Sequence, residues 1–162
     1  MTGNLRDLAE RIRSECVELE RVLVRAFEAW KRAQTTADDL YLDSVALSLH
    51  NFYNGIEKIF KLVATTIDGT LPGGANWHQQ LLVQMAKEIP TIRPAVISEE
   101  TLQALDEYRG FRHLVRNVYA HYFEPVMLQR LVERAPEIFQ KVKAELLAFA
   151  NFLEEAEQST KA

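Results

Sequence analysis

The 162-residue sequence has few of the residues that break helices or cross-link chains. Its 6 Gly and 5 Pro fall below the usual combined share of about 12%, so turn residues are scarce. A β-sandwich or β-barrel needs a turn about every 8–12 residues, which excludes those folds here. The single cysteine, Cys16, excludes a disulfide framework and a cysteine-rich zinc site.

Long apolar runs are missing as well. The longest, AELLAFANFL at 144–153, is far shorter than the roughly 20 residues that span a bilayer. The charged N-terminus, MTGNLRDLAERIR, lacks the apolar centre of a signal peptide. We therefore expect a soluble, cytoplasmic protein with no membrane partner. The net charge of −4 argues against a general nucleic-acid coat protein but leaves room for a local basic patch.

Apolar residues recur at helical spacing between the few turn residues. The first row, over residues 5–30, predicts one long amphipathic helix. Further rows predict helices over about 40–67, 77–89 and 98–122, and in the C-terminal region after Pro125 and Pro136, each placed in a first helical turn. The sequence therefore predicts one all-α domain over residues 1–162, an antiparallel, up-and-down bundle of four to five helices.

The stretch YRGFRHLVRNVYAHYF, from Tyr108 to Phe123, carries the most chemical information. On a helical wheel one arc is apolar, and the other holds Arg109, His113, Arg116, Asn117 and His121, with Arg112 at the border. No acidic residue interrupts the segment from Arg109 to Arg116, which favours a local anion site suited to phosphate. A solvated basic face with incidental histidines is the alternative interpretation.

Arg116 and His121 are five positions apart, about 140° around an ideal helix, so they do not meet well within one straight helix. They converge if the helix loosens before Pro125, or if a two-fold axis brings two copies together. Asn117 lies four positions before His121 and can orient its imidazole.

This stretch resembles the R-x4-H motif of the HEPN superfamily, in particular the HepT-like toxins that pair with minimal nucleotidyltransferase (MNT) antitoxins. Two further segments are similar to the same family: LHNFYNGIEKIF at 49–60 and IDGTLPGGANWHQQLL at 67–82. The resemblance spans about 40–150. It implies a HEPN-like helical bundle that forms a homodimer with both motifs lining one cleft.

The resemblance implies a metal-independent endoribonuclease toxin of a type VII-like HEPN/MNT pair, with no cofactor and with tRNA or mRNA as substrate. Arg116, His121 and Asn117 are the catalytic residues carried over. Arg109, Arg112 and His113 are expected to bind RNA phosphate. An imidazole can move protons at the 2′-OH or the 5′-oxygen, and a guanidinium can stabilise charge on phosphorus, which gives a 2′,3′-cyclic phosphate. The alternative is a non-catalytic partner subunit of the nucleotidyltransferase.

The sequence departs from the family at one position. Many HepT-like toxins resemble R-x4-H-x-Tyr, and the antitoxin adenylylates that Tyr, but here the position holds Phe123. Tyr122 and Tyr119 are the neighbouring candidates for modification. Inhibition by binding alone, or no control of this kind, stays open.

The second predicted helix carries a polar face with His50, Asn54 and Glu57. This face is either a solvated stripe, or a second wall of the cleft or a surface for the antitoxin. His78, beside Trp77, is assigned a structural role. None of the four histidines has metal-ligand spacing to another ligand, so no metal site is expected.

Overall fold

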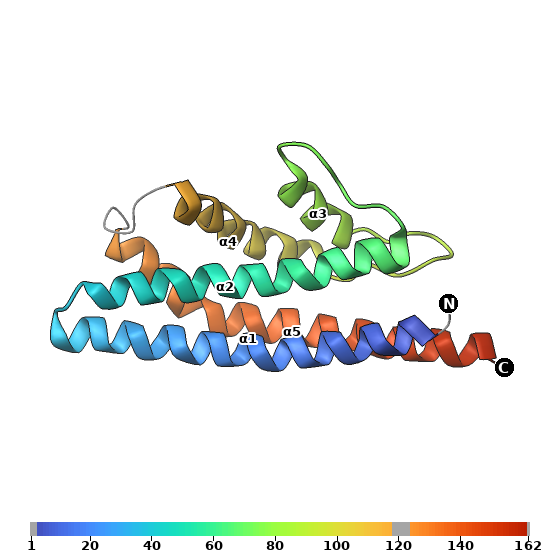
Figure 1. Ribbon diagram of the computed structural model, residues 1–162, viewed down its shortest axis with the longest axis horizontal. Coiled ribbons are helices and arrows are strands. Elements are labelled where there is room, and N and C mark those ends of the chain that lie inside the picture. The colour runs from blue at the N-terminus through green and yellow to red at the C-terminus, as the bar shows by residue number, and fades with distance from the viewer. Residues whose placement is uncertain (1–2, 118–123, 162) are drawn as a thin grey trace.

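The computed structural model describes residues 3–117 and 124–161, and the fold is all-α, which confirms the predicted class (Figure 1). The elements in chain order are α1 (Gly3–Thr36), α2 (Leu40–Val63), the π-helical turn η1 (Ala64–Asp68), α3 (Trp77–Met85), α4 (Glu99–Asn117) and α5 (Pro125–Lys161). No helix in these described ranges is long and apolar enough to cross a membrane.

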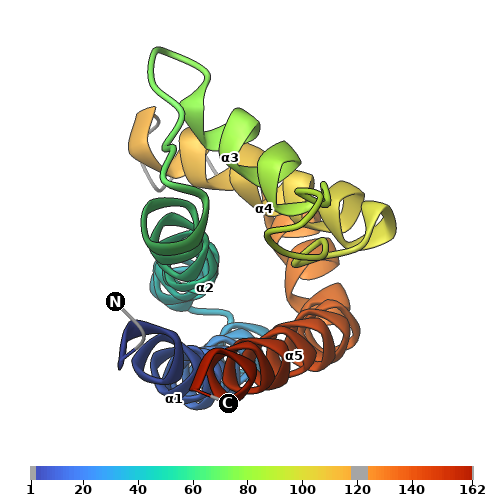
Figure 2. The same ribbon diagram turned by 90° about the vertical axis from the view of Figure 1, so that its right-hand side faces the viewer.

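Three long helices, α1, α2 and α5, form the body of the molecule. α1 packs along both α2 and α5, and the chain termini lie at the same end (Figure 1). Viewed along the helices, α4 and α3 lie together on the far side of α2 from α1 (Figure 2). The short α3 and the second half of α4 therefore lie apart from the layer that α1 and α5 form.

The core is built from the apolar rows that the sequence shows. Cys16 is 2% exposed and lies in the buried row of α1, as a small apolar residue would. Phe52 of α2 meets Tyr108 of α4 and Phe139 of α5 in edge-to-face contacts, with ring centroids 5.7 and 6.1 Å apart. Phe52 thus joins α2 to both later helices.

Ser98 caps the N-terminus of α4. Its Oγ accepts a hydrogen bond from the backbone N–H of Thr101 at 3.1 Å. Glu145 of α5 accepts hydrogen bonds from the Ser98 N–H at 3.0 Å and from the Thr101 hydroxyl. The start of α4 is therefore fixed both locally and to α5.

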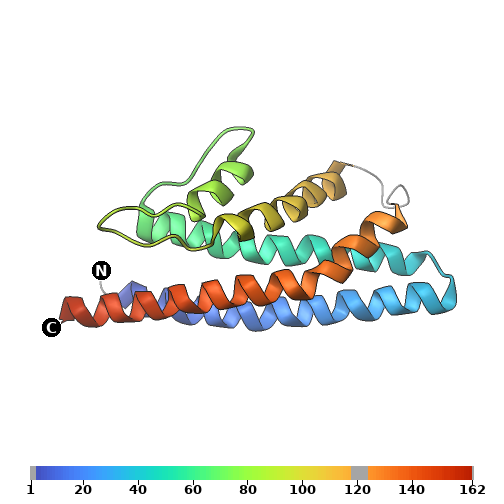
Figure 3. The same ribbon diagram turned by 180° about the vertical axis from the view of Figure 1, so that it is seen from behind.

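Two predicted helix boundaries are wrong. α3 ends at Met85 rather than Ile89, because the Met85 carbonyl accepts hydrogen bonds from the N–H groups of Val96 and Ile97 in the following loop. Pro136 lies inside α5 and does not begin a helix. Pro136 is exposed, whereas Ala135 and Phe139 beside it are buried, so packing of the apolar face outweighs the hydrogen bond that a proline removes. Figure 3 shows that α5 is bent in its N-terminal part.

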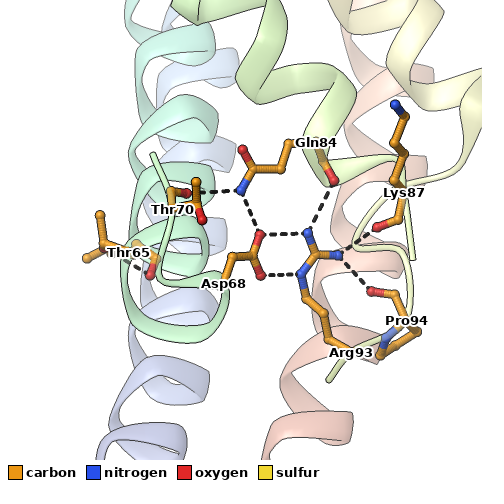
Figure 4. A network of polar contacts seen from close by, with 8 residues as sticks. Thr65, Asp68, Thr70, Gln84, Lys87, Arg93 and Pro94 are labelled. Atoms are coloured by element: carbon orange, nitrogen blue, oxygen red, sulfur yellow. Dashed lines mark hydrogen bonds and ion pairs between the residues drawn. The ribbon is translucent and has the colours of Figure 1, made fainter. Parts of the chain in front are cut away.

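A buried ion pair fastens α3 and its following loop to the end of α2 (Figure 4). Asp68 of η1 accepts hydrogen bonds from Arg93 Nε at 2.6 Å and Nη2 at 2.8 Å. The other N–H groups of Arg93 donate to the carbonyl oxygens of Lys87, Pro94 and Gln84. The Gln84 amide in turn donates to Asp68 at 2.7 Å. Every N–H of the guanidinium has a partner, which satisfies the condition for burying this charge.

Candidate functional site

A pocket of about 560 Å³ opens between the start of α3 and the second half of α4. Its lining residues are Ala75, Asn76, His78, Gln79, Arg109, Arg112, His113 and Arg116. We call it the anion pocket, because three guanidinium groups line it and no acidic residue does. The structure thus brings together the three predicted phosphate-binding residues, Arg109, Arg112 and His113, and the predicted catalytic Arg116.

Arg112 lies at the floor of the anion pocket and connects it to α2. Its side chain is 12% exposed, and its Nε donates a hydrogen bond to Asn54 Oδ1. Its Nη2 lies 3.9 Å from Glu57 Oε1. The border position that the helical wheel assigns to Arg112 is the point where α4 contacts α2.

The polar face of α2 is not a solvated stripe. Glu57 is 4% exposed, and His50 and Asn54 are half-buried beneath α4. Asn54 Nδ2 lies 3.3 Å from His50 Nδ1, and Asn54 Oδ1 accepts from Arg112. The amide therefore donates to the imidazole, which leaves the proton of neutral His50 on Nε2.

His50 is held in an environment that favours its neutral form. Its Nε2 is buried with no hydrogen-bond partner among the described residues. Burial lowers the pKa of His50 from the ordinary 6.5, against a hydrogen bond with Asn51 that raises it, and the charges of Arg112 and Arg116 lower it further. His50 therefore supports Asn54 as a neutral group.

The remaining basic side chains of the pocket differ in how they are held. Arg109 donates from Nε to Asp106 Oδ1 at 2.6 Å, one turn earlier on α4. Arg116 is exposed and makes no ion pair or side-chain hydrogen bond with any described residue. His113 is exposed at the pocket rim. Arg116 is thus the guanidinium most available to an incoming anion.

The sequence interpretation assigned His78 a structural role, but the structure places it in the wall of the anion pocket. His78 Nδ1 lies 2.7 Å from Glu57 Oε2, and Trp77 packs against the ring with centroids 3.6 Å apart. No sequence pattern gives this contact, since the partners are 21 residues apart and a turn-rich loop separates their helices. The adjacent Trp-His pair just after that loop was the one available signal.

Several predicted residues lie outside the described ranges or at their limit. Asn117 is the last residue of α4. His121, Tyr119, Tyr122 and Phe123 lie outside the described residues. The relation of Arg116 to His121 therefore stays a prediction. In the described part of the chain, no group of three or more His, Cys, Asp or Glu side chains is placed to hold a metal ion.

Comparison with known proteins assigns the chain to a family. The family model described as "HepT-like protein" matches residues 44–153, which include α3, α4 and nearly all of α2. The chain belongs to the HepT-like family of the HEPN superfamily. Neither the curated proteins nor the solved structures give a significant match.

Proposed function

We propose that the protein is a metal-independent endoribonuclease toxin that acts as a homodimer and is controlled by a cognate MNT-type nucleotidyltransferase. The HepT-like family is associated with ribonuclease activity. The observation that carries the proposal is the anion pocket itself. On a chain of net charge −4, Arg109, Arg112 and Arg116 line one cavity whose lining holds no acidic residue.

The side chains of the anion pocket suit RNA cleavage by internal attack. RNA supplies its own nucleophile, the 2′-OH, so the protein needs only to hold the phosphate, stabilise its charge and move protons. Arg112, fixed by α2, is suited to position the phosphate, and the exposed Arg116 to stabilise the pentacoordinate phosphorus. His121, with Asn117 orienting it, moves protons at the reacting oxygens. The products are a 2′,3′-cyclic phosphate and a 5′-hydroxyl.

The test is incubation of the protein with total RNA in the presence of EDTA, followed by mapping of the RNA ends. We expect the wild type to leave cyclic phosphate ends, and Arg116→Ala and His121→Ala to lose cleavage while they stay folded and dimeric. Arg21→Ala is the matched control, since it removes another exposed arginine, from α1 on the opposite side of α2. Cleavage retained in both pocket variants contradicts the mechanism.

The competing hypothesis is that the protein is a non-catalytic partner subunit, and a growth test separates it from a toxin. Expressed without its antitoxin, a toxin arrests growth, and Arg116→Ala relieves the arrest. A partner subunit binds the nucleotidyltransferase tightly and leaves growth unchanged.

A further inference from the structure

His78 and Glu57 form a histidine–carboxylate pair at the anion pocket. Glu57 is 5% exposed at its side chain and lies beneath α4, whereas His78 is 24% exposed and faces the cavity. The pair joins the start of α3 to the middle of α2, and Arg112 of α4 approaches the other oxygen of the same carboxylate. Three helices thus meet at one buried carboxylate.

The contact with Glu57 determines which ring nitrogen of His78 is left to accept a proton in the pocket. A carboxylate only accepts hydrogen bonds, so Nδ1 carries the proton that Glu57 accepts. In the neutral imidazole, Nε2 then holds the lone pair. Nε2 has no hydrogen-bond partner among the described residues. An imidazole whose Nδ1–H is bound by a carboxylate, and whose Nε2 is unprotonated, can accept a proton at Nε2.

The surroundings of the pair favour a chemical role over a purely structural one. Trp77 packs on the His78 ring, and Lys61 Nζ lies 4.9 Å from the Trp77 ring centroid. The imidazole ring is therefore held in place by Trp77 as well as by Glu57. The same cavity wall carries the three guanidinium groups that bring a phosphate to it. A histidine needed only for packing does not require a place in that wall.

We propose that His78, oriented by Glu57, is the general base of this site, a catalytic group contributed by α3 from outside the Arg116–His121 stretch. The inference rests on the proposed ribonuclease function and deepens it. Nε2 of His78 takes the proton of the 2′-OH as the bond from O2′ to phosphorus forms. The bond from phosphorus to O5′ breaks, and O5′ receives a proton from the acid, His121. Glu57 touches no reacting atom and is a positioning residue.

The test measures cleavage of a labelled RNA oligonucleotide by the wild-type chain and three variants. We expect His78→Ala to lower kcat by about 10²- to 10⁴-fold, the usual worth of general-base catalysis. Added imidazole restores part of this rate, which a structural defect would not allow. Gln80→Ala on the same helix is the control, since Gln80 is exposed and does not line the anion pocket. His78→Gln guards against misfolding and should be equally slow at an unchanged thermal midpoint.

Glu57 requires a test that separates orientation from folding. We expect Glu57→Gln to lower kcat by about 10- to 100-fold in the wild type. In the His78→Ala background the part of the effect that acts through His78 is gone, so the same change should lower kcat much less, by no more than the contact of Glu57 with Arg112 contributes. An undiminished effect in that background overturns the positioning role.

The outcomes separate this inference from the proposed function. Loss of cleavage in Arg116→Ala together with full cleavage in His78→Ala and His78→Gln overturns the base assignment alone. Absence of cleavage by the wild type overturns both. RNA with a sulfur leaving group at the 5′ position needs no acid, so it should rescue His121→Ala but not His78→Ala. Rescue of His78→Ala by that substrate overturns the assignment of His78 as base.

Discussion

Asp68 and Arg93 are 25 residues apart in the chain and form an ion pair with side chains only 2% and 0% exposed. The pair connects the end of α2 to the loop after α3, and so fixes the helix that carries His78. Its energetic role follows from its burial, because each charge is tolerated there only while the other is present.

We expect Arg93→Met to destabilise the protein by about 3–5 kcal/mol, since it leaves Asp68 buried without its cation. Urea unfolding measures the free energy of unfolding directly. The matched control is Arg21→Ala, whose ion pair with Glu18 is exposed, and which should change stability by less than about 1 kcal/mol. An equally small loss in Arg93→Met would contradict a stabilising role for the pair.

Two helical glycines should respond to alanine in opposite directions. A Cβ at Gly110 meets nothing within 4 Å, so Gly110→Ala should stabilise α4 by up to about 1 kcal/mol. A Cβ at Gly55 would lie 2.6 Å from Cδ2 of the buried Leu19, and the overlap should cost about 1–3 kcal/mol. Thermal unfolding of both variants gives the comparison, and stabilisation by Gly55→Ala would show that α1 can shift away.

His50 should make stability depend on pH. Burial lowers its pKa in the folded protein, so below pH 6.5 the unfolded chain binds more protons at this residue than the folded one. Its contribution is complete above pH 6.5 and is lost as the pH falls from there through the folded pKa. We expect His50→Gln to lose less free energy of unfolding than the wild type between about pH 7 and about pH 5. Equal losses would exclude His50 as the source.

The nucleotidyltransferase partner that we propose should modify a tyrosine next to the predicted motif if control is covalent. Phe123 has no hydroxyl, so we expect adenylylation at Tyr122 or Tyr119 when the two proteins are incubated with ATP. Intact-mass spectrometry should show one added nucleotide, lost in the Tyr119→Phe, Tyr122→Phe double variant and kept in Tyr41→Phe. Inhibition of cleavage without any mass change would point to control by binding.

The helices were predictable because burial follows a period that the sequence displays. Leu19 and Phe52 belong to unbroken apolar rows, and both are buried in the core. Pro136 misled because local preference favours a helix start there, whereas the buried residues around it hold one continuous helix. Local rules give the elements, and packing decides where neighbouring elements merge.

The anion pocket was predictable only in part. The arginines of α4 share one helix, so their common face follows from 3.6-residue periodicity. The placement of α3 depends on the ion pair between Asp68 and Arg93, which are 25 residues apart in the sequence. Hydrophobic periodicity carries no information about such long-range contacts. The sequence therefore connects His78 with Trp77 but gives neither its contact with Glu57 nor its place beside the arginines of α4.

The complete hydrogen bonding of the Arg93 guanidinium has a consequence for purification of the protein. With all five N–H groups committed inside the fold, its charge cancels that of Asp68 and attracts nothing from outside. We therefore expect the anion pocket beside α4 to attract polyanions, although the chain as a whole carries a net charge of −4. Such a protein should be retained on an anion-exchange column and also on heparin, where elution at lower salt after Arg116→Ala would mark the attracting face.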